Sequence, residues 1–99
     1  MSEKYKRHEE ICQMLTEVYI KKNKDYGDSF GEMFQELGII TAVTRIGDKY
    51  GRLKNLVKVG ERQVKDESIR DTLLDMANYC IMTVMELEIQ EREKGRESL

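Results

Sequence analysis

The stretch from residue 67 to residue 88, ESIRDTLLDMANYCIMTVMELE, constrains the fold more than any other part of the chain. Plotted at about 100° per residue, its apolar side chains gather on one broad face of a helix. They are Ile69, Leu73, Met76, Ala77, Cys80, Ile81 and Val84. This period predicts a long amphipathic helix whose apolar face is buried.

A row of carboxylates runs beside that apolar face. Glu67, Asp71 and Asp75 follow one another one helical turn apart, and Asn78 falls within the same arc of roughly 80°. Like charges at this spacing weaken a bare helix by about 0.2–0.5 kcal/mol per pair. The row therefore predicts a positive partner, either a divalent cation or basic side chains of another helix. A solvated acidic face is the alternative, but Asp75 borders the apolar stripe, which favours a functional role.

Three further segments have helical patterns. Residues 4 to 22 repeat apolar side chains at helical spacing, and residues 29 to 37 form a short helix with a capping box at Ser29 and Glu32 and a stop at Gly38. Residues 39 to 58 form a second long helix, whose predicted core stripe is Ile39, Val43, Ile46, Tyr50, Leu53 and Val57.

Two segments break the helical pattern. The polar run NKDYGDSFG, residues 23 to 31, has the composition of a loop. Residues 59 to 66 are predicted to be a short connection, in which Gly60 ends one helix and Asp66 caps the next. The last helix is expected to fray near Lys94.

Size and composition limit what such a chain can be. With 99 residues, no proline or tryptophan and 36% charged residues, it is expected to be one all-α domain spanning residues 1–99. A net charge of -2 predicts no direct nucleic-acid binding, and without a long apolar run we expect a cytoplasmic protein with no membrane partner. Cys12 and Cys80 are interpreted as small core residues of a reduced protein.

These observations predict a helical bundle of two to three long helices plus a short one. The apolar faces are wide for the small core of a single chain, so we expect a homo-oligomer, most simply a dimer, to complete the bundle. Gly47 and Gly51, both inside a helical pattern, suit the close approach of another helix.

The loop and the second long helix carry side chains that suit a nucleotide. Tyr26 offers a stacking face for a base, and Lys22, Lys24, Asp25 and Asp28 around it supply charge, so that the lysines could meet phosphate. Equally, the loop aromatics, Phe30 above all, could plug the core. Across the helix, one arc of about 120° holds Arg45, Asp48, Lys49 and Arg52. Such a face suits phosphate binding, or salt bridges to the row of carboxylates.

Three runs in order, KNKDYGDSF, RIGDKYGRLKNL and VKDESIRDTLLDMANYCIMTVMEL, resemble the nucleotide modification associated domain family, the first of that name. The resemblance covers about residues 21 to 88. It implies a small all-α protein of phages or bacteria, associated with nucleotide or DNA-base modification and without a settled reaction.

The chain is also distantly similar to MazG-type all-α nucleoside triphosphate pyrophosphatases, whose paired carboxylates bind Mg²⁺. The two carboxylate pairs are matched here by Glu32–Glu36 and Asp71–Asp75, although both are four residues apart instead of three. The similarity implies metal ligands at Asp71 and Asp75, with Glu67 or Glu36 completing the site. Carboxylates one turn apart share a helix face and suit Mg²⁺, which prefers oxygen ligands.

Two functional hypotheses follow. The first is a Mg²⁺-dependent enzyme that hydrolyses a nucleoside triphosphate to monophosphate and pyrophosphate. Its expected nucleotide-binding residues are Lys24, Asp25, Tyr26, Arg45, Asp48, Lys49, Arg52 and Asn78. The second is a non-catalytic helical module, a nucleotide sensor or the partner of a modification enzyme. The sequence leaves open whether the chain is an enzyme, and it assigns no catalytic residue.

Overall fold

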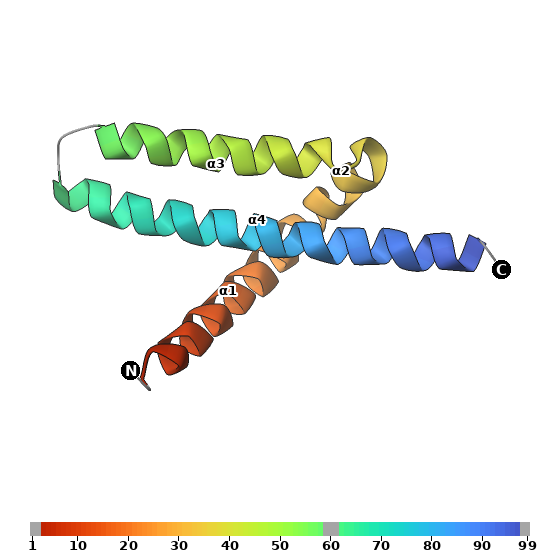
Figure 1. The fold of residues 1–99 in the computed structure, drawn as a ribbon, viewed down its shortest axis with the longest axis horizontal. Helices are drawn as coiled ribbons and strands as arrows, with labels where there is room; N and C mark the ends of the chain where they lie inside the picture. Colours follow the sequence, from red (N-terminus) through yellow and green to blue (C-terminus); the bar gives the residue numbers. More distant parts are fainter. Residues whose placement is uncertain (1–2, 59–61, 98–99) are drawn as a thin grey trace.

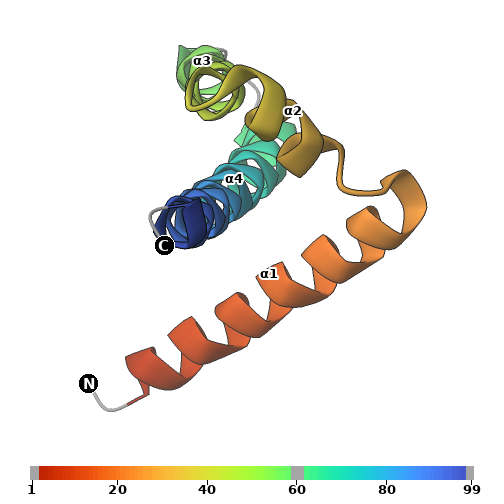
Figure 2. The same cartoon turned by 90° about the vertical axis from the view of Figure 1, so that its right-hand side faces the viewer.

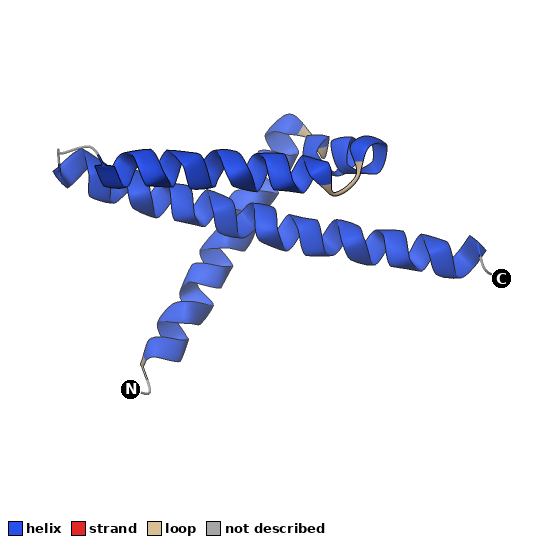
Figure 3. Ribbon diagram, turned by 45° about the horizontal axis from the view of Figure 1, so that its top comes forward, coloured by secondary structure: helices blue, strands red, loops and turns tan. Residues whose placement is uncertain are grey.

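The computed structural model describes residues 3–58 and 62–97, and the regular structure in this part is helical (Figure 3). Its four helices are α1 (Lys4–Tyr26), α2 (Ser29–Leu37), α3 (Ile40–Lys58) and α4 (Arg62–Glu97). The predicted all-α fold is confirmed, and α2 has the predicted bounds.

The two long helices α3 and α4 lie side by side and run in opposite directions (Figure 1). The short helix α2 carries the chain from α1 across to the start of α3. Helix α1 crosses α4 obliquely and projects away from the pair (Figures 1 and 2). Of the side chains of α1, only Leu15 is buried, so α1 is attached through a small area near its C-terminal half.

The loop between α1 and α2 is shorter than the sequence pattern predicts. Helix α1 continues through the polar run to Tyr26 and ends because Gly27 adopts φ 72°, where its N–H donates to the Asn23 carbonyl at 2.8 Å. Asp28 then caps α2 by accepting a hydrogen bond from the Gly31 N–H at 3.2 Å. The predicted loop over residues 23–31 and the predicted cap at Ser29 were therefore wrong, since polar residues alone do not stop a helix.

The other helix ends agree only in part with the sequence analysis. Gly38 ends α2 as predicted, with φ 78° and its N–H donating to the Phe34 carbonyl at 2.7 Å. Helix α4 already begins at Arg62 and continues to Glu97, so Asp66 lies inside it and the fraying expected near Lys94 is not seen. Gly60 lies outside the described residues.

An aromatic cluster forms the centre of the core. Phe34 of α2 is fully buried, and the Phe30 ring lies 6.1 Å from the Phe34 ring and 5.5 Å from the Tyr79 ring, centroid to centroid. These distances are those of favourable tilted aromatic pairs. The alternative in which Phe30 plugs the core beneath the loop is confirmed, and the cluster fixes α2 against the middle of α4.

The buried face of α4 is not the predicted apolar stripe. Among the side chains of residues 67–95, the buried ones are those of Thr72, Thr83 and Glu86. Thr72 Oγ1 donates to the Ser68 carbonyl at 2.7 Å and Thr83 Oγ1 to the Tyr79 carbonyl at 2.6 Å, while Gln35 Nε2 donates to Glu86 Oε1 at 2.9 Å. These polar groups can be buried because each is hydrogen-bonded.

The predicted apolar stripes lie largely on the surface. Leu73, Cys80, Ile81 and Val84 of α4 are exposed, and so are Ile39 beside α3 and, within α3, Val43, Tyr50 and Val57. The predicted burial of these faces is not reached within one chain, because spacing identifies an apolar face but not the surface that covers it. The interpretation of Cys12 and Cys80 as core residues was wrong for the same reason: both thiols are free and exposed. The homo-oligomer that the sequence analysis expects to complete the bundle stays a prediction.

The molecule is extended for its size. It exposes 8089 Å², whereas a compact monomer of 11.7 kDa exposes about 5900 Å². Its radius of gyration is 16.3 Å, against about 13 Å for a compact chain of this length. Across the described residues, no helix has the combination of length and apolarity that spanning a bilayer requires.

Candidate functional site

A cleft of about 380 Å³ opens where the C-terminal end of α1, the start of α2 and the middle of α4 meet. Its volume is within the range typical of small-molecule sites, about 300–1000 Å³. The lining side chains combine aromatic rings with a few charged and amide groups. They are Tyr19, Lys22, Asn23, Tyr26, Gly27, Asp28, Ser29, Phe30, Lys49, Asp75, Asn78, Tyr79 and Met82.

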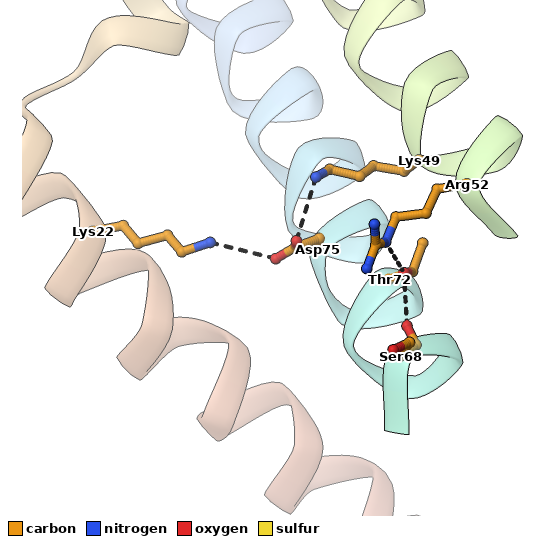
Figure 4. A network of polar contacts seen from close by, with 6 residues as sticks. All are labelled: Lys22, Lys49, Arg52, Ser68, Thr72 and Asp75. Carbon is orange, nitrogen blue, oxygen red and sulfur yellow. Dashed lines mark hydrogen bonds and ion pairs between the residues drawn. The ribbon is translucent and has the colours of Figure 1, made fainter. Parts of the chain in front are cut away.

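Two lysines from different helices converge on one carboxylate in the cleft wall (Figure 4). Lys22 Nζ of α1 lies 3.4 Å from Asp75 Oδ1, and Lys49 Nζ of α3 lies 3.5 Å from Asp75 Oδ2. Asp75 and Lys49 are half-buried, whereas Lys22 is more exposed. The site therefore concentrates two positive charges and one negative charge within a few ångströms.

The helical repeat explains why these side chains meet. Lys22 follows Leu15, the buried residue of α1, by two turns, so both point towards α4. Lys49 follows the buried Ala42 of α3 by two turns in the same way. Asp75 lies on the side of α4 that faces α1, which places it between the two ammonium groups. The salt bridge that the sequence predicted between the carboxylate row and the basic helix is confirmed for Lys49.

Asn78 links α4 to α1 by a hydrogen bond beside the cleft. Its Nδ2 donates to the backbone carbonyl of Leu15 at 3.1 Å. An amide side chain has a second donor hydrogen and an acceptor oxygen, so Asn78 can hold α1 and still offer polar groups to the cleft that it lines.

Aromatic rings supply the apolar part of the cleft. Phe30 and Tyr79, which pack on each other in the core, also line it. Tyr26, the last residue of α1, is 76% exposed and stands at the cleft. Exposed aromatic rings beside cations suit the stacking of a planar ligand.

Arg52 lies outside the cleft lining and has a structural contact instead. Its Nε donates to Thr72 Oγ1 at 3.2 Å, and Thr72 in turn donates to the Ser68 carbonyl (Figure 4). This short chain of hydrogen bonds ties α3 to α4 one turn away from Asp75.

The cleft unites some of the predicted nucleotide-binding residues and leaves others out. Tyr26, Lys49 and Asn78 line it. Outside its lining, on exposed surface, lie Lys24, Asp25, Arg45, Asp48 and Arg52. The sequence analysis did not select Tyr19, Asn23 or Tyr79, and it named Lys22 among the charged residues around Tyr26 without keeping it in the expected binding set. The sequence feature that could have identified Lys22 is its spacing of two helical turns from Leu15. This spacing places Lys22 at the cleft only once α1 is known to cross α4.

The predicted metal ligands do not come together. Among the four carboxylates, Asp75 lines the cleft, whereas Glu36, Glu67 and Asp71 are exposed outside its lining. Within the described residues, no three His, Cys, Asp or Glu side chains form a group suited to a metal ion. The surroundings of Asp75 do not fit a divalent cation, because two ammonium groups already flank its oxygens. The Mg²⁺ site stays a prediction without an assembled donor set.

Together these features define a small all-α protein with a cleft that is aromatic on one side and cationic on the other. The chain belongs to the family described as Nucleotide modification associated domain 1, whose model matches residues 22–87. The match includes every residue that lines the cleft except Tyr19 of α1. A search of curated proteins gave no match, and neither did a search of solved structures. The distant similarity to MazG-type enzymes stays a prediction.

Proposed function

We propose that this protein binds a nucleotide in the cleft, with a phosphate group between Lys22 and Lys49. The observation that carries the proposal is the convergence of these two lysines, from helices far apart in the sequence, at 3.4 and 3.5 Å from a single carboxylate. Each ammonium has three donor hydrogens. It can therefore hold Asp75 and also donate to a phosphate oxygen.

The rest of the cleft supports a ligand with a planar base. Stacking of a base on an aromatic side chain contributes about 1–3 kcal/mol, and Tyr26 is exposed at the cleft. Asn78 adds amide donors and an acceptor of the kind that recognise a base edge or a sugar. The family description, which links this domain to nucleotide modification, points in the same direction.

We propose that the cleft binds a nucleotide, and we assign no reaction to it. Hydrolysis of a nucleoside triphosphate was predicted to depend on Mg²⁺ held by Asp71, Asp75 and Glu67 or Glu36, and the described residues assemble no such group. Binding by lysines needs no metal, because ammonium groups are themselves effective phosphate ligands. A nucleotide-binding module that serves a modification enzyme accounts for these features.

A thermal-shift comparison tests the proposal. The protein is melted with nucleoside mono-, di- and triphosphates, each with and without Mg²⁺, and with the nucleoside alone. A ligand at ten times its Kd stabilises by about 1.4 kcal/mol, which raises Tm by roughly 6–11 °C for a domain of this size. We expect a shift with phosphorylated ligands, little with the nucleoside, and no requirement for Mg²⁺.

Paired lysine variants locate the binding site. Lys22→Met removes a cation that lines the cleft, whereas Lys24→Met removes a cation from the same turn of α1 outside the lining. We expect the first substitution to abolish most of the nucleotide shift and the second to leave it unchanged. Equal effects of the two substitutions, or the absence of any shift in the parent protein, would show that the cleft does not bind phosphate through Lys22.

A further inference from the structure

One set of exposed apolar residues on α3 and α4 follows a heptad pattern. On α4 it consists of Leu73, Cys80, Val84 and Leu87 together with the half-buried Ala77, at alternating spacings of four and three residues. On α3 the corresponding positions are Val43, Gly47, Tyr50 and Val57. We call these nine residues the seam. Val43 is 57% exposed and Val84 55%, although such positions are those that pack in helical bundles.

Both halves of the seam face the same side of the molecule. On α4 the seam lies about 100° around the helix from the buried Thr72 and Thr83, and on α3 it lies about 100° from the buried Ala42. Because the two helices are antiparallel, these equal rotations point in one direction. Figure 2 shows α2 to the right of α3 and α1 below and to the right of α4, and no described helix lies on the left side of the pair. The seam is thus one continuous two-helix surface away from the cleft.

The excess exposed area of the whole chain, to which the projecting α1 also contributes, is large enough to include the surface that a stable dimer buries. The chain exposes 8089 Å², roughly 2200 Å² more than a compact monomer of its mass. Obligate dimers bury about 1000–2500 Å² from each partner. The surroundings of Gly47 also fit an uncovered seam, because a Cβ added there would meet no atom within 4 Å. If a helix approaches Gly47 closely, it comes from outside the chain.

The charges at the two ends of the seam are of opposite sign. Lys54, Lys58 and Arg70 lie at one end and Glu88 and Glu91 at the other, all of them exposed; Arg92 stands further round α4. On α4, Arg70 and Glu91 occupy the next heptad positions before Leu73 and after Leu87. The apolar positions of the seam are therefore spaced nearly symmetrically about Cys80, and its two ends carry opposite charge, one basic and one acidic. A surface of this kind is complementary to a second copy of itself that runs in the opposite direction.

We propose that a second copy of this chain covers the seam, with the two α4 helices antiparallel and crossing near Cys80. The two α3–α4 pairs then form a four-helix bundle, and Arg70 of each copy meets Glu91 of the other. The cleft faces the other way in each copy, so this assembly and nucleotide binding can fail independently.

Light scattering on two matched variants tests which surface assembles. Val84→Glu places a charge in the seam, whereas Ile20→Glu places one on α1, where Ile20 is also exposed. Both side chains are exposed in the single chain, so neither substitution should disturb its fold, which circular dichroism checks. We expect a dimeric parent protein, a dimeric Ile20→Glu variant and a monomeric Val84→Glu variant. A monomeric parent protein, or a dimer that only Ile20→Glu dissociates, would overturn the proposal.

Two further experiments test the orientation. A short bismaleimide crosslinker should join the dimer through Cys80, so Cys80→Ser should prevent crosslinking and Cys12→Ser should not. Arg70→Glu and Glu91→Arg should each weaken dimerisation on the order of tenfold, because each reverses two rim charge pairs, and the double variant should recover the parent affinity. Crosslinking through Cys12 alone, no crosslink in a dimeric protein, or a double variant weaker than either single one would contradict the antiparallel arrangement.

Discussion

Replacing Asp75 with asparagine removes the charge on which the two lysines converge and keeps the shape of the side chain. The Asp75 oxygens lie 3.4 Å from Lys22 Nζ and 3.5 Å from Lys49 Nζ. Without the negative charge, nothing offsets the repulsion between the two ammonium groups on either side of residue 75. We expect the Asp75→Asn variant to be less stable than the parent protein when no ligand is present, and to bind phosphate more tightly.

The size of both effects follows from the exposure of the three side chains. Those of Lys22 and Asp75 are 60% and 36% exposed, and that of Lys49 is 29% exposed. Ion pairs at such positions contribute about 0.2–1 kcal/mol each, so the free energy of unfolding should fall by about 1 kcal/mol, or about 4–8 °C in Tm. Removing a negative charge about 5 Å from a bound phosphate favours binding by about 1 kcal/mol at a water-like dielectric, roughly fivefold in Kd.

Thermal melts and calorimetric titration with a nucleotide measure the two effects. Asp71→Asn is the matched control, because Asp71 lies one turn away on α4, is exposed and does not line the cleft. The reasoning is refuted if the Asp75→Asn and Asp71→Asn variants have the same Tm. It is equally refuted if Asp75→Asn loses nucleotide binding, a result that would favour the metal-ligand role predicted from the sequence.

Three further substitutions have expected outcomes. Tyr26→Ala should change stability by less than about 0.5 kcal/mol, since the ring is 76% exposed, but should weaken nucleotide binding by about 1–3 kcal/mol in a titration. Phe34→Ala should lower the free energy of unfolding in urea by about 3–5 kcal/mol, because the ring is fully buried. Arg52→Ala should lower that free energy by about 1 kcal/mol through loss of its hydrogen bond to Thr72, and should leave the nucleotide-induced Tm shift unchanged.

The sequence predicted helices well because helix formation leaves a local signature. The bounds of α2 and the ends of α3 follow from glycine signals and apolar spacing, and the structure agrees with them to within one residue at each end. The exact stop of α1 could not be predicted, because Asn23 and Asp25 are tolerated inside a helix until Gly27 reverses the backbone.

The site was harder to predict because it depends on how the helices cross. Lys49 and Asp75 were selected from charge patterns on single helices, and they meet as expected. Lys22 was noted among the charged residues around Tyr26, but its meeting with Asp75 could not be predicted because it depends on α1 crossing α4, which no local pattern encodes. In the same way, apolar spacing did not select the buried Thr72 and Thr83, because the hydrogen bond that permits the burial of each hydroxyl forms within the helix turn itself.

Helix α1 contacts α4 over a small area, so α1 should detach from α4 more easily than the rest of the protein unfolds. Leu15 is the one buried side chain of this helix, and the Asn78 amide and Lys22 supply its polar links to α4. Its release should require far less free energy than global unfolding, so amide hydrogens of α1 should exchange with solvent much faster than those in the middle of α4. A ligand that binds Lys22 and Lys49 together links α1 to the α3–α4 pair. It should therefore slow the exchange of amide hydrogens along α1, by a factor determined by the free energy of ligand binding.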